Sequence, residues 1–532
     1  MKIYLESLGC CRNQIDSEVM LGRLTSNGHK ICPDPSEAEV IIVNTCGFIA
    51  AASAEAVETI LTLAQYKNKE QSDVTNQTNS NDSEDSLSEG NCRHLVVTGC
   101  LPERFKNDTI AESMPEVDAF LGTGACDQIV ETIETLESRF QKKQSNTILL
   151  LPDPCNRQFQ GYPLPRHLTL DYSAFLKISE GCNRHCTYCI IPKLRGKQRS
   201  RPIDQVVEET QYLLKQGVKE IILVGENTTD YGSELTPPAS LVKLLQAVSA
   251  TVDKHIQTGN TNLHTATSDI LSANYGDPER NSDTLTENSD ILKKTLDIKS
   301  EQTDINIPKI SKEAPWIRLL YTHPSSISKS TIETIAFLDN ICTYFDIPVQ
   351  HASSGVLKRM GRNYTLDDLY RLFATIREIS PDAALRTTLI TGFPGETEKD
   401  FEIMLQFIKD VRFDHLGVFP YSDSEDLASH HLKNHIPENI AEERLAILMN
   451  AQALISEEKN EKYLNQTIKV LVEENPDEGI YLGRSRFQAP EVDGLTFIYG
   501  SGLEIGQFAD VYITETHEYD LAGQRSLHVQ RT

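Results

Sequence analysis

The sequence predicts an α/β fold built from three modules. Apolar segments of strand length alternate with helical segments through the first 435 residues, and short alternating segments follow a long helix near the C-terminus. Alternation of strands and helices is typical of parallel sheets. Short strands separated by Gly and Asp are typical of a small barrel. We therefore expect an N-terminal open parallel α/β domain, a central partial (βα) barrel and a C-terminal small antiparallel β-barrel.

The expected boundaries are 1–150 for the first domain, 165–435 for the second, 437–463 for a helical connector and 464–532 for the small barrel. Two polar stretches interrupt the first two domains, at about 67–92 and at about 252–313. Neither stretch has enough apolar surface to offset the entropy lost when it becomes ordered. We expect both to be disordered insertions.

In the first domain, three apolar segments are expected to form parallel strands. They span residues 2–7, 39–43 and 94–98, and helices are expected at 14–24 and 50–65. The thiols of Cys10, Cys46 and Cys100 each lie just past the carboxyl end of one of these strands. Because such ends converge on one crevice in an open α/β sheet, we expect the three thiols to form a metal site.

Two alternatives remain open for this first set of cysteines. Free Cys is among the most buried residue types, so all three could be core or loop residues. Cys11 is the substitute ligand if Cys10 is the wrong member of the adjacent pair. Six cysteines outside both sets lack this position and are interpreted as structural: Cys11, Cys32, Cys92, Cys126, Cys155 and Cys342.

A second set of cysteines lies close together in the central domain. Cys182, Cys186 and Cys189 have the spacing C-x3-C-x2-C. Clustered thiolates bind zinc or iron–sulfur clusters, but structural zinc needs four ligands, and neither a fourth Cys nor a suitably spaced His follows. Three thiolates that hold a four-iron, four-sulfur cluster leave one iron open to a substrate. A structural metal knuckle or three unrelated thiols is the alternative.

Repeated βα units predict the central barrel. Expected strands span 220–224, 317–321, 344–348, 384–390 and 413–419, and expected helices include 201–215, with Gly217 as its cap, and one that follows Thr397. Thr397 and Asp400 have the spacing of a capping pair. The apolar residues expected on one face of this helix are Phe401, Met404, Leu405 and Ile408. Function in such a barrel belongs at the carboxyl ends of the strands.

Polar residues near these strand ends are candidate cofactor ligands. Glu226 can accept a hydrogen bond from an amino group, and Gln350 and Arg386 could bind a carboxylate or a ribose. His323 and His351 are compatible with both core packing and substrate contact, and neither is chosen. No side chain is predicted to act as a general acid or base.

The helical connector presents one face made of Leu445, Leu448, Gln452 and Ile455, and the strands of the small barrel are expected at 467–473, 479–484, 495–499 and 509–514. Residues 464–532 contain five Lys or Arg and eleven Asp or Glu, a balance of −6. Phosphate contacts supply most of the nonspecific affinity for nucleic acid. This balance therefore favours a basic protein as the partner.

Composition limits the location and the partners of the chain. No apolar run approaches the roughly 20 residues that span a bilayer, and the N-terminus lacks the apolar core of a signal peptide, so we expect a cytoplasmic protein. In a reducing compartment, the twelve Cys are better interpreted as metal ligands or free thiols than as disulfides. The net charge of −26 opposes long-range attraction to nucleic acid.

The cysteine motifs and their flanks carry a resemblance to a known family. The stretch around Cys182, Cys186 and Cys189, with Tyr188 as the aromatic residue before the third Cys, resembles the radical S-adenosylmethionine (SAM) signature. Residues 7–17, 44–49 and 98–101 resemble the N-terminal domain of the methylthiotransferases, although that family more often has Pro in place of Cys11. Residues 464–532 resemble the OB-like TRAM domain, and 483–494 and 518–521 resemble the ribosomal-protein branch.

The resemblance implies a fold, cofactors and a reaction. It implies a six-unit radical SAM barrel, one four-iron, four-sulfur cluster on Cys182, Cys186 and Cys189, and an auxiliary one on Cys10, Cys46 and Cys100. SAM would bind the open iron, with contacts expected from Tyr188, Glu226, Gln350 and Arg386. A 5′-deoxyadenosyl radical would then remove a β-hydrogen from an aspartate of small-subunit ribosomal protein uS12. Sulfur from the auxiliary site and a methyl group from a second SAM would complete the methylthio group.

The resemblance also implies partners and leaves two alternatives. The basic protein uS12 is the expected partner, with ribosomal RNA contacted only indirectly, and an electron donor of flavodoxin or ferredoxin type is required. The sister activity, methylthiolation of an adenosine in transfer RNA, is the first alternative. A non-catalytic iron–sulfur or zinc-binding scaffold is the second.

Overall fold

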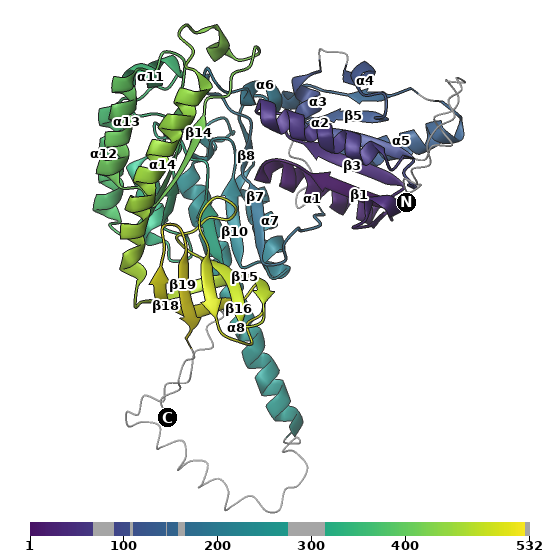
Figure 1. Ribbon diagram of the computed structural model, residues 1–532. Helices are drawn as coiled ribbons and strands as arrows, with labels where there is room; N and C mark the ends of the chain where they lie inside the picture. Colours follow the sequence, from purple (N-terminus) through teal and green to yellow (C-terminus); the bar gives the residue numbers. More distant parts are fainter. Residues whose placement is uncertain (68–89, 107–109, 145, 158–164, 275–313, 527–532) are drawn as a thin grey trace, which may run out of the picture.

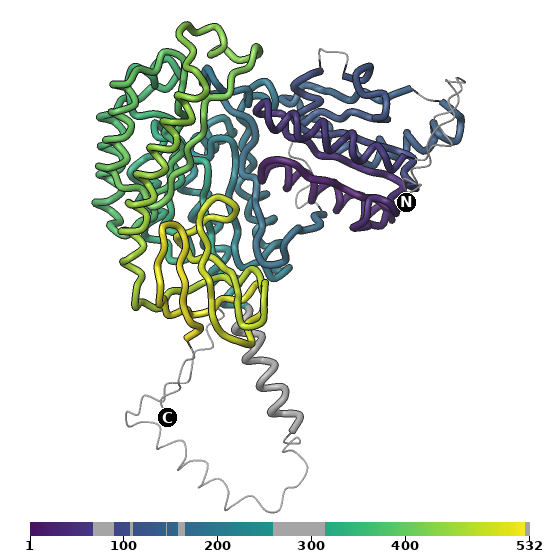
Figure 2. The backbone as a smooth tube through the Cα atoms, viewed as in Figure 1, coloured from purple at the N-terminus to yellow at the C-terminus, as the bar shows by residue number. Residues whose placement is uncertain are grey.

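The computed structural model describes residues 1–67, 90–106, 110–144, 146–157, 165–274 and 314–526, and only the helical backbone for 259–274 (Figures 1 and 2). The expected disorder of 67–92 falls almost wholly outside the described residues, as does that of residues 275–313. Residues 252–274, expected to be part of an insertion, instead continue helix α8 (Leu241–Asn274), so the prediction was wrong for this stretch. None of the helices described is long and apolar enough to cross a membrane.

The N-terminal domain is a six-stranded parallel sheet with helices on both faces. Its strand order is β2-β1-β3-β4-β5-β6, and every neighbouring pair is parallel. The strands are β1 (Lys2–Ser7), β2 (Lys30–Ile31), β3 (Val40–Thr45), β4 (His94–Gly99), β5 (Ala119–Gly122) and β6 (Ile148–Leu150). The helices are α1 (Cys11–Ser26), α2 (Ala50–Ala64), α3 (Cys100–Arg104), α4 (Ile110–Ser113) and α5 (Ile129–Gln141). The expected open parallel α/β fold is confirmed.

Alternate residues of each strand pack on opposite faces of this sheet, as strand geometry requires. Ile3, Val40 and Ile42 pack with Met20 of α1 and Ile129 of α5. On the other face, Ile41, Val43 and Val97 pack with residues of α2, among them Ala56 and Ile60. The helices therefore cover both faces and leave the carboxyl edge of the sheet to the polar loops.

Six parallel strands form the central barrel. They are β7 (Ser173–Lys177), β10 (Glu220–Val224), β11 (Trp316–Leu319), β12 (Tyr344–Asp346), β13 (Ala384–Thr391) and β14 (His415–Pro420). They make two three-stranded sheets that a single bridge, Ile317 to Ile341, joins between β11 and β12. The outer helices are α7 (Ile203–Lys215), α8, α10 (Lys329–Phe337), α11 (Ser354–Arg359), α12 (Leu366–Ile379), α13 (Glu398–Val411) and α14 (Glu438–Asn460).

Helix α13 begins with the expected capping pair. The Thr397 hydroxyl accepts from the Asp400 backbone N–H at 3.3 Å, and the Asp400 carboxylate accepts from the Thr397 N–H at 2.9 Å. Of the expected inward residues, Leu405 is only half-buried, and Phe407 takes its place in the core. Helix α14 covers most of the expected connector, and it packs on the barrel, where Gln452 donates to the Phe413 carbonyl at 2.8 Å.

The C-terminal module is a closed five-stranded barrel. Its strands are β15 (Thr467–Asp477), β16 (Ile480–Ser485), β17 (Thr496–Tyr499), β18 (Phe508–Thr516) and β19 (Leu521–Arg525), in the order β15-β16-β17-β19-β18. The prediction missed β19, and the barrel is not wholly antiparallel, because β17 pairs with β19 in parallel. Arg484 of this barrel donates to Glu220 of β10 at 2.6 Å and ties the module to the central domain.

Candidate functional site

The thiols of Cys10, Cys46 and Cys100 lie at one edge of the N-terminal sheet. Cys10 caps the start of α1 after β1, Cys46 follows β3, and Cys100 opens α3 directly after β4. These three strands are parallel neighbours, with Ser7 paired to Asn44 and Thr45 paired to Gly99. Consecutive parallel strands end at the same edge, which explains why residues so far apart in sequence meet.

Two glycines allow this close approach. Gly9 has φ +91°, and a Cβ there would lie 2.7 Å from the Cβ of Cys46. Gly99 has φ +99°, and a Cβ there would lie 2.6 Å from the Thr45 carbonyl oxygen. Both conformations are disfavoured for residues that carry a Cβ. The chain therefore needs glycine at both positions to bring the three thiols together.

The charges of these thiols affect one another, which indicates that they lie within electrostatic range. Burial raises the pKa of the Cys100 thiol to about 11, with smaller upward contributions from Cys10 and Cys46 and an opposing one from Arg195. Burial also raises the pKa of Cys46, and Cys10 adds to this. Burial alone would raise the pKa of Cys10, but Arg12 and Arg195 outweigh it, and the pKa is lowered.

The neighbouring Cys11 is directed elsewhere. Its thiol is 3.5 Å from the Tyr321 hydroxyl, and its side chain packs with Phe175 and Ile222 of the barrel. Burial raises the pKa of Cys11 to about 11. The structure therefore places Cys10, and not Cys11, with Cys46 and Cys100.

The second set of thiols lies on the loop between β8 (Ser179–Glu180) and α6 (Ile191–Arg195). The Arg184 backbone N–H donates to the Cys182 sulfur at 3.4 Å, and the Cys189 N–H donates to the Cys186 carbonyl at 3.1 Å. Burial raises the pKa of Cys182 to about 11 and that of Cys189 to about 12, and Cys186 contributes to both shifts. The three thiols of the motif thus share one small region.

The two sets of thiols lie on either side of one interface between domains. Cys100 packs against Ile190, which follows Cys189, and against Leu194 of α6. The Arg12 guanidinium on α1 is 3.7 Å from the Glu226 carboxylate, and both groups are electrostatically coupled to cysteines, Arg12 to Cys10 and Glu226 to Cys182. Arg195, which ends α6, reaches the Cys100 sulfur at 3.6 Å.

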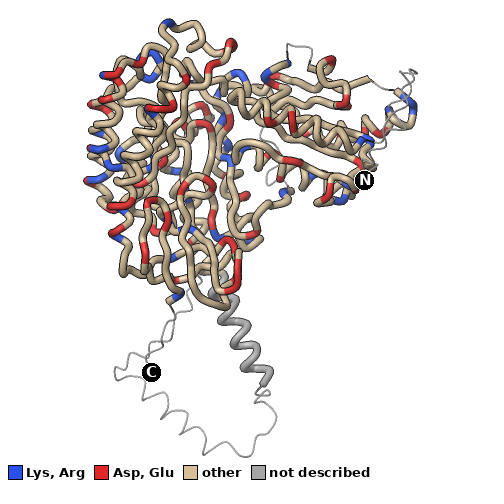
Figure 3. The backbone as a smooth tube through the Cα atoms, in the orientation of Figure 1, with Lys and Arg blue, Asp and Glu red and all other residues tan. Residues whose placement is uncertain are grey.

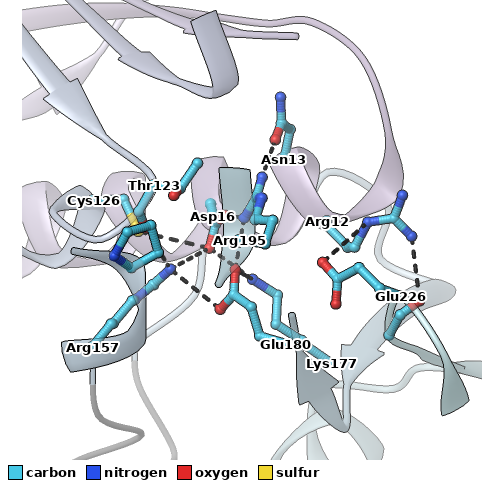
Figure 4. Close-up of polar contacts among 12 residues, drawn as sticks. Arg12, Asn13, Asp16, Thr123, Cys126, Arg157, Lys177, Glu180, Arg195 and Glu226 are labelled. Atoms are coloured by element: carbon cyan, nitrogen blue, oxygen red, sulfur yellow. Dashed lines mark hydrogen bonds and ion pairs between the residues drawn. The ribbon is translucent and has the colours of Figure 1, made fainter. Parts of the chain in front are cut away.

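A buried network of ion pairs fastens this interface (Figure 4). Asp16 of α1 accepts from Lys177 at 2.9 Å and from Arg195 at 2.8 Å, and Arg157 lies 3.3 Å from it. Glu180 pairs with Arg195 at 2.7 Å and with Lys177 at 3.5 Å. Burial alone would raise the pKa of Asp16, but Lys177, Arg157 and Arg195 hold it far below the ordinary value.

The donor chemistry of both sets fits iron–sulfur clusters. Each set offers three thiols and no imidazole or carboxylate among its predicted ligands, and thiolates are the usual ligands of such clusters. Among the described residues, no three His, Cys, Asp or Glu side chains are arranged to hold one metal ion. A cluster differs from a single ion because each thiolate binds a separate iron atom, and so the sulfurs need not converge on one point.

Glu226 is the candidate SAM contact with unmet hydrogen-bonding capacity. Both of its carboxylate oxygens are buried and have no hydrogen-bond partner in the described part of the chain. Burial raises the pKa of this carboxyl, and Arg12 opposes the shift. A buried acceptor without a donor is costly, so a cationic donor such as an amino group would stabilise it.

Of the other three SAM candidates, Tyr188 and Arg386 have side-chain partners within the protein, and Gln350 is held through its backbone. The Tyr188 hydroxyl accepts from Arg362 at 2.6 Å, and its ring packs edge-on against Phe393. Arg386 lies 3.0 Å from Asp346 and 3.5 Å from Asp493 of the C-terminal barrel. Gln350 lies beyond the end of β12, has φ +69° and forms an isolated parallel bridge with Leu389 of β13. A contact of any of these with SAM stays a prediction.

The two histidines left undecided are both buried in the barrel. His351 lies 3.4 Å from Glu396, and its Nδ1 accepts from the Ser353 N–H at 2.9 Å. Burial lowers the pKa of His323 to about 2, with Arg362 adding to the shift. These contacts favour a packing role for both residues.

The sequence interpretation missed the charged residues of the interface. Arg195, Glu180 and Lys177 flank the C-x3-C-x2-C motif, and Asp16 lies six residues after Cys10. One signal could have identified Asp16: it stands between Ile15 and Val19, on a helix whose apolar face was expected to be buried. A charge in that position requires a buried partner.

Comparison with known proteins matches all three modules. Residues 176–408 match the radical SAM superfamily, 2–122 match the uncharacterized protein family UPF0004, and 466–525 match the TRAM domain. The ribosomal protein uS12 methylthiotransferase RimO of Desulfosudis oleivorans is 41% identical over 525 residues, which cover 98% of this chain and 100% of that protein. The protein of the same name in Clostridioides difficile is 38% identical over 98% of both chains.

One solved structure with partial similarity is a methyltransferase. The radical S-adenosylmethionine methyltransferase TsrM from Kitasatospora setae has a TM-score of 0.46 and 12% sequence identity, over 78% of this chain and 72% of that chain. A similarity this low carries no conclusion about the site.

Proposed function

The chain belongs to the family of ribosomal protein uS12 methylthiotransferases, and on this premise we propose that it adds a methylthio group to the β-carbon of an aspartate in ribosomal protein uS12. It is a radical SAM enzyme, and its cofactors are SAM and iron–sulfur clusters. The observation that carries the proposal is the position of the two sets of three thiols on either side of one domain interface. Such a site can make a radical and deliver sulfur to the same substrate carbon.

We assign the ligands of the two clusters by position. Cys182, Cys186 and Cys189 would hold the cluster that binds SAM, and Cys10, Cys46 and Cys100 would hold the auxiliary cluster. When bound, these groups supply the one-electron chemistry needed to break an unactivated C–H bond and the sulfur that replaces the hydrogen. The protein keeps the two sets of ligands in register through the ion pairs that Asp16 of the N-terminal domain makes with Lys177 and Arg195 of the central domain.

Glu226 would orient SAM by accepting from its amino group. The carboxylate has two buried oxygens without hydrogen-bond partners among the described residues, and it is electrostatically coupled to Cys182. Tyr188 and Arg386 are weaker candidates, since their present partners would have to be shared, and no contact of the Gln350 side chain is described that would orient it. Tyr188 and Arg362 would instead support the cysteine loop from the α11 side, where the Thr187 hydroxyl donates to the Arg359 carbonyl at 2.9 Å.

The charge of the C-terminal barrel supports a basic protein substrate. Arg484 pairs with Glu220 and Glu473, and Arg486 donates to the Ile341 carbonyl, so neither of these two cations serves a nucleic acid. Lys469 pairs with Asp510 at 3.0 Å. Acidic residues lie along the same module in Figure 3. A groove of phosphate-binding cations, as expected for the transfer-RNA alternative, would need free Lys or Arg.

The reaction also requires an electron donor of flavodoxin or ferredoxin type, and we propose that the enzyme acts in the cytoplasm, where ribosomes are modified. The test is a reaction of the reconstituted enzyme with SAM, a low-potential reductant and purified uS12. Mass spectrometry of the intact uS12 should show an increment of one CH2S unit, located on an aspartate by fragmentation. A methylthio group on an adenosine of transfer RNA, with none on uS12, would reject the proposed substrate.

A further inference from the structure

The Arg195 guanidinium makes two kinds of contact with different nitrogens. Its Nη1 lies 2.8 Å from Asp16 and 2.7 Å from Glu180, which are carboxylates of the N-terminal and central domains. Its Nη2 donates to the Asn13 amide oxygen and lies 3.6 Å from the Cys100 sulfur. The residue is 2% exposed. One side of the guanidinium therefore joins the domains, and the other side is directed at a proposed cluster ligand.

Arg195 belongs to the segment that carries the other thiol set, although it contacts Cys100. Arg195 is the last residue of α6, the helix that directly follows the loop of Cys182, Cys186 and Cys189. The next residue, Gly196, accepts a hydrogen bond from the Cys182 N–H at 3.1 Å. The segment that shapes one thiol set thus supplies a donor to a sulfur of the other set.

Asn13 holds the guanidinium in this orientation. Its amide nitrogen donates to the carbonyls of Leu8 and Thr45, both at 2.9 Å, which fixes the side chain at the carboxyl edge of the sheet. Its amide oxygen, which faces Arg195, is 4.0 Å from the Cys100 sulfur. The donor at Cys100 is therefore preorganised by the N-terminal domain as well as by α6.

We propose that Arg195 is a positioning residue that donates a hydrogen bond to the Cys100 sulfur and so raises the reduction potential of the auxiliary cluster. Reduction adds negative charge to a cluster, and a cationic donor on a ligand sulfur stabilises the reduced form more than the oxidised form. The inference rests on the proposed role of Cys100 as a ligand. It assigns to the central domain a direct influence on the cluster of the N-terminal domain.

The test uses a full-length background in which Cys182, Cys186 and Cys189 are all changed to Ala, so that only the auxiliary cluster can form. Iron and sulfide per chain are measured after reconstitution, and a redox titration is followed by electron paramagnetic resonance. Arg195→Gln should shift the potential of the cluster to a more negative value. Lys177→Met is the matched control, because Lys177 contacts the same two carboxylates, and no contact with the six proposed ligands is described for it. It should leave the potential unchanged.

The inference is overturned if Arg195→Gln loads iron fully and keeps the parent potential, or if Lys177→Met shifts it equally. If Arg195→Gln does not retain its cluster, the potential is measured in Arg195→Lys instead. A smaller negative shift of the potential supports the inference, and a potential equal to that of the parent overturns it. Loss of iron from both Arg195 variants overturns the inference, because Arg195 would then be needed to hold the cluster and not to set its potential. If the background variant itself takes up no iron, the assignment of Cys10, Cys46 and Cys100 as cluster ligands is wrong, and the inference about Arg195 is wrong with it.

Discussion

Cys10 and Cys11 are adjacent residues with opposite surroundings. Cys10 precedes the first turn of α1 and faces the other strand ends, where Arg12 and Arg195 lower its pKa. Cys11 begins the helix and faces the barrel core, where burial raises its pKa to about 11. Position after a strand favoured Cys10, the member of the pair that lies with Cys46 and Cys100. The sequence left Cys11 open because the direction of a side chain at a helix start depends on packing.

Replacing one cysteine in each of the two thiol sets should have different effects on SAM cleavage and on formation of the methylthio product. Cys182→Ala should abolish formation of 5′-deoxyadenosine and of methylthio product, because it removes a proposed ligand of the cluster that binds SAM. Cys46→Ala should keep part of the SAM cleavage and lose the methylthio product. Both products are measured by chromatography with mass detection after reaction with uS12.

Cys92→Ala is the matched control for these two variants. Its thiol is buried in the N-terminal domain, where its sulfur lies 3.4 Å from the His94 carbonyl, and it belongs to neither set. It should retain both activities. Equal loss of cleavage and of product in Cys46→Ala would contradict separate roles for the two thiol sets.

The capping pair of α13 allows a test at the scale of one helix. Thr397→Ala removes the hydroxyl that accepts from the Asp400 N–H, and such a loss typically costs about 1 kcal/mol. We expect a lower denaturant midpoint for the unfolding transition of the barrel. Thr375→Ala in α12 is the control, because the Thr375 hydroxyl donates only to the Arg371 carbonyl one turn earlier in the same helix. A midpoint equal to that of the parent would contradict a stabilising cap.

Local patterns predicted elements well where one face of the element is buried. The strands at 2–7, 220–224 and 384–390 were found with shifts of at most one residue at either end. Strand β19 was missed because Ala522 and Gly523 have low strand propensity, and it forms only because β17 and β18 pair with it. Tertiary pairing of this kind leaves no local signal in the sequence.

For helix α8 the prediction failed in the opposite way, because a helical segment was predicted to be disordered. Polar composition predicted disorder from residue 252, yet the helix runs to Asn274. Its buried residues Leu244, Leu245, Val248 and Val252 anchor the first turns against the barrel. Once a helix has nucleated, each further residue adds a backbone hydrogen bond at low cost, so composition alone does not locate its end.

At the scale of the whole molecule, Glu220 links two modules. Its carboxylate lies between Arg318 of the barrel, at 2.8 Å, and Arg484 of the C-terminal module, at 2.6 Å. Burial alone would raise the pKa of Glu220, but Arg484 and Arg318 outweigh it and hold the pKa at about 2. Because this folded value is below the ordinary 4.5, the carboxylate stabilises the fold above pH 4.5, and the contribution is lost as the pH falls toward 2.

Glu220→Gln should therefore destabilise the protein near neutral pH, by about 3–5 kcal/mol, since it leaves two buried guanidinium groups without their carboxylate. Below pH 4.5 the difference between the parent and the variant should shrink. Urea unfolding of both proteins at pH 7 and pH 3, followed by tryptophan fluorescence from Trp316, measures this. A difference that is the same at both pH values would contradict the assigned charge state.

The same linkage has a consequence for the order in which the chain acquires its final structure. Glu220 and Arg318 are made long before Arg484, and Arg386 is made before Asp493, which lies 3.5 Å from it. Translation proceeds from the amino end, so Glu220 and Arg386 of the central domain emerge from the ribosome before Arg484 and Asp493, their partners in the C-terminal module. These two ion pairs can therefore form only after every strand of the central barrel has been synthesised.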